Sequence, residues 1–127
     1  SPGMHASTFG GGAVVSKAAM GVFKAIRNDK MLANVKKMSP YLFEKLAALK
    51  AKHPSIKEVR GVGFMAGVEL NRKGKEIVEK CLEKGLLINC THDTVLRLMP
   101  ALNVTKRQID TALHILDKVL GEVGYGS

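Results

Sequence analysis

Tryptophan is absent from this 127-residue sequence, and aromatic residues make up only 5% of it. It also has just two cysteines, Cys81 and Cys90, which cannot form a disulfide framework and match no metal-binding spacing. We therefore expect a reduced, cytoplasmic protein without a metal site. No apolar run approaches the roughly 18 residues of a membrane span, and no charged-then-apolar signal segment opens the chain. We expect no membrane association.

Acidic residues are also few, with 11 Asp and Glu against 20 Lys and Arg, which gives a formal charge of +9. Such an excess can serve a nucleic-acid surface. The cations are scattered along predicted helices, however, and the aromatic residues and motifs of common nucleic-acid-binding folds are missing. Solvated helix faces therefore explain the charge better, and we do not expect nucleic acid as a partner. A non-catalytic basic binding module stays open as an alternative.

Hydrophobic residues make up 46% of the chain, enough for one folded domain with a modest core. Apolar spacing predicts helices over 13–28 and 31–52, with Pro40 expected to kink or interrupt the second near Met38–Ser39. A third helix is predicted over 74–84, with Leu82 among its inward residues. A capping-box pattern at Thr105–Gln108 predicts a last helix that Gly121 ends.

Between these helices the period changes to that of strands. Residues 56–70 read as two strands joined at Gly61–Gly63, and short strands are predicted in "LLINC" and "TVLRLM". This order predicts an α/β fold of the α+β layer type, in which helices cover a small, mostly antiparallel sheet. Residues 1–12 fit no core of their own and resemble an arm.

Two features point to chemistry. The run from Ser7 to Gly12 combines hydroxyls and glycines ahead of a helix, which suits a phosphate, although a flexible linker explains it as well. Arg97 stands between two leucines of a predicted strand, where its planar fork can pair with a carboxylate. That partner is either a structural acid of this chain or the carboxylate of a substrate.

Four stretches of the sequence resemble those of a known protein family. They are "PGMHASTFGGG" (2–12), "IKEVRGVGFMAGVEL" (56–70), "KGLLINCTHDTVLRLMPAL" (84–102) and "NVTKRQIDTALHILDKVL" (103–120). In this order and spacing the chain resembles the C-terminal part of the class III pyridoxal-phosphate aminotransferases, most closely the acetylornithine aminotransferases. The resemblance implies the small domain of a fold-type I transferase. It divides the chain into a cofactor-reaching arm (1–12), a linking helix (13–30) and the small domain (31–127).

The resemblance also implies roles for the two features. Thr8 would bind the phosphate of pyridoxal 5'-phosphate, and Ser7 would lie beside the substrate, both reaching into the partner subunit of a homodimer. Arg97 would bind the substrate α-carboxylate. The implied enzyme transfers an amino group between N-acetylornithine and 2-oxoglutarate in arginine biosynthesis. Ornithine, succinyl-diaminopimelate and 4-aminobutyrate transaminases are the alternatives within the family.

The family's Schiff-base lysine lies upstream of the segment that matches Ser7 and Thr8. No lysine of this chain stands in a matching context. We therefore expect no catalytic residue among the 127, and we expect the chain alone to be inactive.

Overall fold

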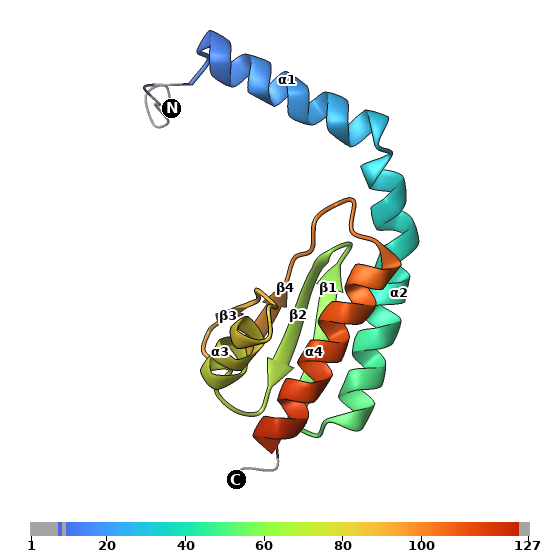
Figure 1. Ribbon diagram of the computed structural model, residues 1–127, viewed down its shortest axis with the longest axis vertical. Helices are drawn as coiled ribbons and strands as arrows, with labels where there is room; N and C mark the ends of the chain where they lie inside the picture. The colour runs from blue at the N-terminus through green and yellow to red at the C-terminus, as the bar shows by residue number, and fades with distance from the viewer. Residues whose placement is uncertain (1–7, 9, 125–127) are drawn as a thin grey trace.

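The computed structural model describes residue 8 and residues 10–124 (Figure 1). Within them the chain forms four helices and one four-stranded sheet. In chain order the elements are α1 (Ala13–Asn28), α2 (Met31–Lys52), β1 (Ile56–Val62), β2 (Met65–Leu70), α3 (Lys75–Glu83), β3 (Asn89–Thr91), β4 (Val95–Leu98) and α4 (Lys106–Gly124). The predicted class is confirmed: a small antiparallel sheet with helices packed on it.

The sheet has the strand order β1-β2-β4-β3, and each neighbouring pair is antiparallel. Val62 pairs with Met65, so the hairpin turn is Gly63–Phe64, two residues later than the start of the predicted turn. Gly63 has φ +60 and Gly61 has φ +149. A Cβ on Gly61 would lie 2.0 Å from the Met65 carbonyl oxygen, so this position of β1 requires glycine.

One face of the sheet carries the core. Along β2 and β4 every second side chain is buried, as a strand with one covered face dictates. These side chains pack with apolar residues of α2, α3 and α4 in a single cluster. Figure 1 shows α4 running along this face beside α2. The best-covered members of the cluster, each with no exposed surface, are Leu46, Val68, Ile77, Cys81, Leu96, Leu116 and Val119.

The structure corrects two expectations about the helices in full and one in part, since the kink expected at Pro40 stays a prediction. α2 runs through Pro40 without interruption, because Pro40 is exposed while Met38 and Leu42 anchor the helix on either side. α4 continues past Gly121 to Gly124, since Val123 is buried beyond it. Leu82 is 57% exposed and does not face the core. The capping box is confirmed: the Thr105 N–H donates to Gln108 Oε1 at 2.9 Å, and the Gln108 N–H donates to Thr105 Oγ1 at 3.3 Å.

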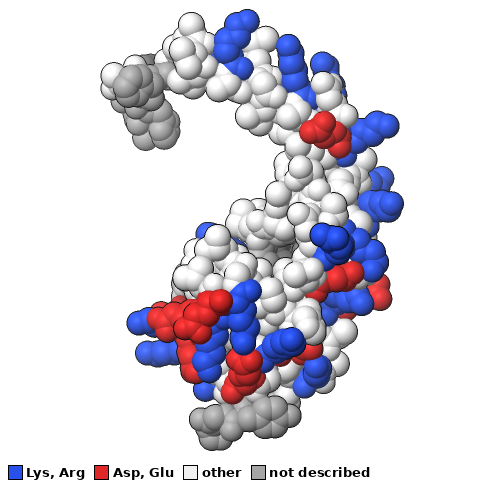
Figure 2. Space-filling model, in the orientation of Figure 1, with Lys and Arg blue, Asp and Glu red and all other residues white. Residues whose placement is uncertain are grey.

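α1 extends away from the rest of the molecule (Figure 1), and none of its residues is buried. Its apolar side includes the exposed side chains of Val15, Val22 and Phe23. The segment 13–52 holds nine of the 20 Lys and Arg but two of the 11 Asp and Glu. Of these nine cations only Lys52 forms an ion pair with another described residue. Figure 2 shows the resulting line of basic side chains along the outer edge of α1 and α2.

Candidate functional site

Arg97 lies on the face of the sheet opposite the core. Its strand neighbours Leu96 and Leu98 are buried, whereas Arg97 is exposed. In the described part of the chain its side chain has neither an ion pair nor a hydrogen bond. A structural acid for Arg97, one of the two interpretations from the sequence, is thus missing among these residues. An unpaired guanidinium can bind the carboxylate of another molecule through two parallel N–H donors.

A network of charges on β1 and β2 occupies the same face of the sheet. Arg60 Nη1 donates to Glu69 Oε2 at 2.5 Å and to Glu58 Oε2 at 3.0 Å. Lys57 Nζ lies 3.5 Å from Glu69 Oε1. The hydrogen bond from Arg60 lowers the pKa of Glu69, and the same bond raises the pKa of Arg60. Glu69 and Glu58 are thus already paired with cations of β1, which leaves Arg97 as the cation of this face that has no described partner.

At the other end of the chain, Thr8 is exposed in a turn before α1, and Ser7 lies outside the described residues. Gly11 has φ +77, and a Cβ there would meet nothing within 4 Å. α1 begins at Ala13, after the N-cap residue Gly12, without a side-chain cap and without an acidic residue in its first turn. Its first backbone N–H groups therefore have no side-chain acceptor, and the helix dipole adds positive charge there. This donor set fits a phosphate group.

The structure does not bring Thr8 and Arg97 together within one chain. α1 has 16 residues, so its axis is about 24 Å long. Thr8 precedes its far end, while the sheet lies beyond α2 (Figure 1). A site that uses both side chains needs either a second copy of the chain or a different position of Thr8 relative to the sheet.

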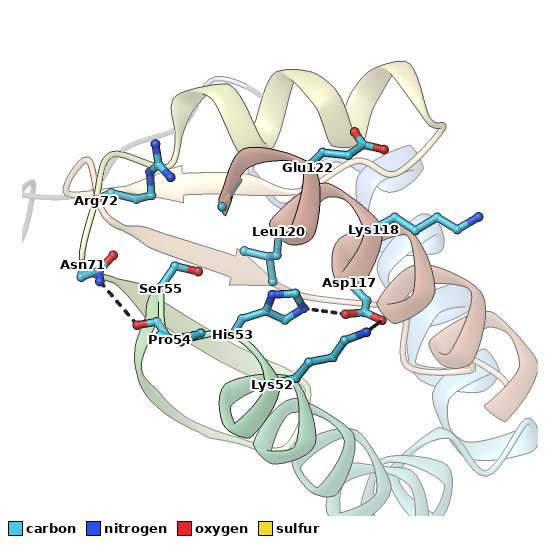
Figure 3. A pocket seen from close by; sticks show the side chains of 12 residues that line it. Lys52, His53, Pro54, Ser55, Asn71, Arg72, Asp117, Lys118, Leu120 and Glu122 are labelled. Carbon is cyan, nitrogen blue, oxygen red and sulfur yellow. Dashed lines mark hydrogen bonds and ion pairs between the residues drawn. The ribbon is translucent and has the colours of Figure 1, made fainter. Parts of the chain in front are cut away.

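A cavity of about 820 Å³ opens near the ends of α2 and α4, and its lining includes neither Thr8 nor Arg97. In Figure 3 the side chains of Lys52 and His53 both point at Asp117. Lys52 Nζ is 2.6 Å from Asp117 Oδ2, and His53 Nε2 is 2.5 Å from Oδ1. The hydrogen bonds from Lys52 and then His53 lower the pKa of Asp117. These polar groups satisfy each other, so we interpret the cluster as a structural clamp between α2 and α4.

Residues 1–120 match the model of the family described as "Aminotransferase class-III". The chain belongs to the class III aminotransferase family. An acetylornithine aminotransferase of Caldanaerobacter subterraneus subsp. tengcongensis is 46% identical over 125 residues, which cover 98% of this aminotransferase chain and 32% of the relative. An ornithine aminotransferase of Geobacillus sp. (strain WCH70) is 38% identical over 122 residues, covering 96% of the chain and 30% of the relative.

A solved structure agrees with these relatives. The ornithine aminotransferase of Toxoplasma gondii, whose active site holds pyridoxal phosphate at partial occupancy, superposes with a TM-score of 0.85 at 28% identity. The match covers 97% of this chain and 30% of that one. The aminotransferase chain described here therefore spans about a third of the length of the relatives it matches.

Sequence reasoning missed two clusters of this aminotransferase chain, the Arg60–Glu69 network and the Asp117 clamp. The alternation in "KEVRGV" could have indicated that Glu58 and Arg60 share a face, but not that Glu69 lies across from them. In the described part of the chain, no group of acids, histidines and cysteines is arranged to hold a metal ion, and no helix has the length and apolarity to cross a membrane.

Proposed function

We propose that this chain is the C-terminal part of a pyridoxal-phosphate-dependent aminotransferase that acts on N-acetylornithine, or a related basic amino acid, and 2-oxoglutarate. The whole enzyme would be a cytoplasmic homodimer of arginine biosynthesis. Family membership supports the reaction class, and the acetylornithine aminotransferase relative supports the amino donor. The observation that carries the proposal is Arg97, an exposed guanidinium on an open sheet face that has no described partner.

In this proposal the chain contributes two binding functions. Arg97 holds the substrate α-carboxylate and thereby orients the substrate. Thr8, together with the open N–H groups at the start of α1, holds the phosphate of the cofactor, and Ser7 lies beside the substrate. When bound, pyridoxal phosphate supplies the electron sink that stabilises negative charge on the substrate carbon. Because Thr8 lies at the far end of α1, these contributions come from opposite subunits.

The same proposal assigns three parts to the chain: an arm over 1–12, a linking helix over 13–30 and a small domain over 31–127. α1 supports this division because it buries no residue, whereas the core residues of the small domain begin in α2. The chain alone is inactive in this proposal because its residues include no Schiff-base lysine.

The test uses the full-length enzyme carrying Arg97→Ala. Losing a charge-assisted hydrogen-bonded pair costs roughly 1.5–3 kcal/mol, which corresponds to a rise of about 10- to 150-fold in KM. We expect this rise for both substrates. The absorbance of the cofactor should show that the variant still binds it. Arg107→Ala, on exposed α4 surface, is the control and leaves KM unchanged. An unchanged KM in the Arg97 variant would refute the role of Arg97.

The amino donor needs its own measurement. Rates of the wild-type enzyme are compared with N-acetylornithine, ornithine, succinyl-diaminopimelate and 4-aminobutyrate at matched 2-oxoglutarate. The proposal expects the highest kcat/KM with N-acetylornithine. A higher value with one of the others would move the chain to that branch of the family.

A further inference from the structure

The net charge of the chain is concentrated on its first two helices. Residues 13–52, which form α1, α2 and the two residues between them, hold nine Lys and Arg against two Asp and Glu, so they carry a net +7 of the total +9. The other 87 residues hold 11 cations against nine acids and are nearly neutral. Cations that look scattered in the sequence are therefore gathered on one part of the molecule.

These nine cations form a surface that we call the basic edge. Figure 2 shows basic side chains following one another along the outer edge of α1 and α2. Every residue of the basic edge is exposed: Lys17, Lys24, Arg27, Lys30, Lys36, Lys37, Lys45, Lys50 and Lys52. In the described part of the chain only Lys52 has an ion pair, so the basic edge is not neutralised by the domain that carries it.

Helical spacing explains how the basic edge continues over both helices. Lys17 and Lys24 are seven residues apart, which puts them on the same side of α1. On α2, Lys37, Lys45 and Lys52 follow each other at spacings of eight and seven residues and share one side of that helix. Since α1 is about 24 Å long and α2 about 33 Å, the charge extends over a length that only a large anion can cover.

The chemistry of the basic edge distinguishes between classes of anionic partner. Eight of its nine cations are lysines, and lysine is depleted at protein–protein interfaces, which centre on apolar and aromatic side chains. A lipid surface needs an apolar helix side to insert beside the cations. The apolar side of α2 is already buried in the core through Met38, Leu42, Leu46 and Leu49. A partner that is recognised by charge alone fits better, and the phosphate backbone of a nucleic acid is such a partner.

We propose that the basic edge binds the phosphate backbone of a double-stranded nucleic acid without reading its sequence. Lysine ammonium groups act as point charges toward phosphates, and phosphate contacts carry no sequence information. Single strands bind through bases stacked on aromatic rings. Tyr41, the aromatic residue beside Lys45, already has Lys45 Nζ 5.4 Å and Lys106 Nζ 4.6 Å from its ring centre, so it offers no free stacking face. This inference is independent of the proposed transaminase function.

The test measures binding of a fluorescein-labelled DNA duplex of about 24 base pairs to the full-length enzyme, by fluorescence anisotropy from about 50 to 200 mM salt. We expect the binding constant to fall steeply with salt, because each neutralised phosphate contributes about −0.9 to the slope of log K against log salt. The triple variant Lys24→Gln/Arg27→Gln/Lys37→Gln removes three cations of the basic edge. Its slope should be less steep by about 2.7 if each cation contacts one phosphate.

A matched control separates the basic edge from total charge. Lys73→Gln/Arg107→Gln/Lys118→Gln also removes two lysines and one arginine, all exposed, outside the basic edge and without an ion pair in the described part of the chain. This second triple variant has the same net charge as the first and should keep the wild-type slope. The thermal midpoint of each variant shows whether it is folded.

Each result supports or overturns the inference. No binding of the duplex at about 50 mM salt overturns it, and so does an equal loss of slope in the two triple variants, since total charge would then be the cause. Tighter binding to a single strand of the same length, or to vesicles of phosphatidylglycerol, overturns the assignment to a duplex. Transaminase rates of the same preparations are a separate readout: their absence would refute the proposed function and leave the duplex result unaffected.

Discussion

Gly74 offers a sharp test of how tightly the core is packed. It precedes α3 with φ −89 and ψ −3, an allowed conformation with negative φ, so Gly74→Ala does not require a left-handed backbone. The added Cβ would lie 2.7 Å from Cys90 Sγ, 3.0 Å from Leu96 Cδ2 and 3.5 Å from Leu70 Cδ1. Leu96 and Leu70 are both buried, so they have little room to move.

The magnitude follows from two opposing effects. Overpacking a core by a methyl group costs about 1–3 kcal/mol, while restricting the unfolded chain returns roughly 0.4–1 kcal/mol. We therefore expect Gly74→Ala to lower the free energy of unfolding by about 1–2 kcal/mol. Gly121→Ala is the matched control: it lies inside α4, where an added Cβ meets nothing within 4 Å. It should raise the free energy of unfolding by roughly 0.5 kcal/mol.

Urea unfolding followed by circular dichroism at 222 nm measures both variants of this chain. The midpoints should move in opposite directions while the slope stays constant. Adding Cys90→Ala to Gly74→Ala removes the closest contact and should recover part of the loss. Equal or raised stability in Gly74→Ala would refute the packing argument.

Two further predictions concern titratable groups. Lys52 and His53 lower the pKa of Asp117 from its ordinary value of 3.8. The clamp therefore stabilises the folded state above pH 3.8, and this stabilisation is lost as the pH falls through the lower pKa of the folded state. Asp117→Asn should thus be less stable than wild type at neutral pH, with the gap closing below pH 3.8; a gap that persists in acid would contradict the clamp. Burial raises the pKa of the Cys81 thiol to about 11, whereas Cys90 is partly exposed. Iodoacetamide at pH 8 should therefore alkylate Cys90 well before Cys81, as peptide mass spectrometry would show, and equal rates would contradict the burial of Cys81.

The helices and the fold class were predictable because local spacing determines them. The apolar faces of α2 and α4 follow from the 3.6-residue period of a helix. The Thr105–Gln108 cap depends on contacts between residues three apart in the sequence. The errors came from tertiary contacts that override local signals. Buried Val123 carries α4 through Gly121, and buried Met38 and Leu42 hold α2 together across Pro40.

Only part of the candidate site could be predicted from the sequence. Alternation placed Arg97 opposite its leucine neighbours on one strand, and the structure confirms this. The pairing of Gly67 with Arg60 on one side and with Arg97 on the other depends on the strand order β1-β2-β4 and on its register. No local pattern encodes such pairing, so the sequence alone could not place Arg60 on the same face of the sheet as Arg97.

The unburied state of α1 has a consequence for how the chain melts. A helix of 16 residues without a covering partner has the marginal stability of an isolated peptide, because packing supplies most helical stability in proteins. Its amides should exchange with solvent by local fraying, whereas those of β2 and β4 should exchange only when the whole sheet opens. A single unfolding free energy measured on this chain would therefore describe the sheet and its three packed helices, and α1 would follow its own, non-cooperative helix–coil equilibrium.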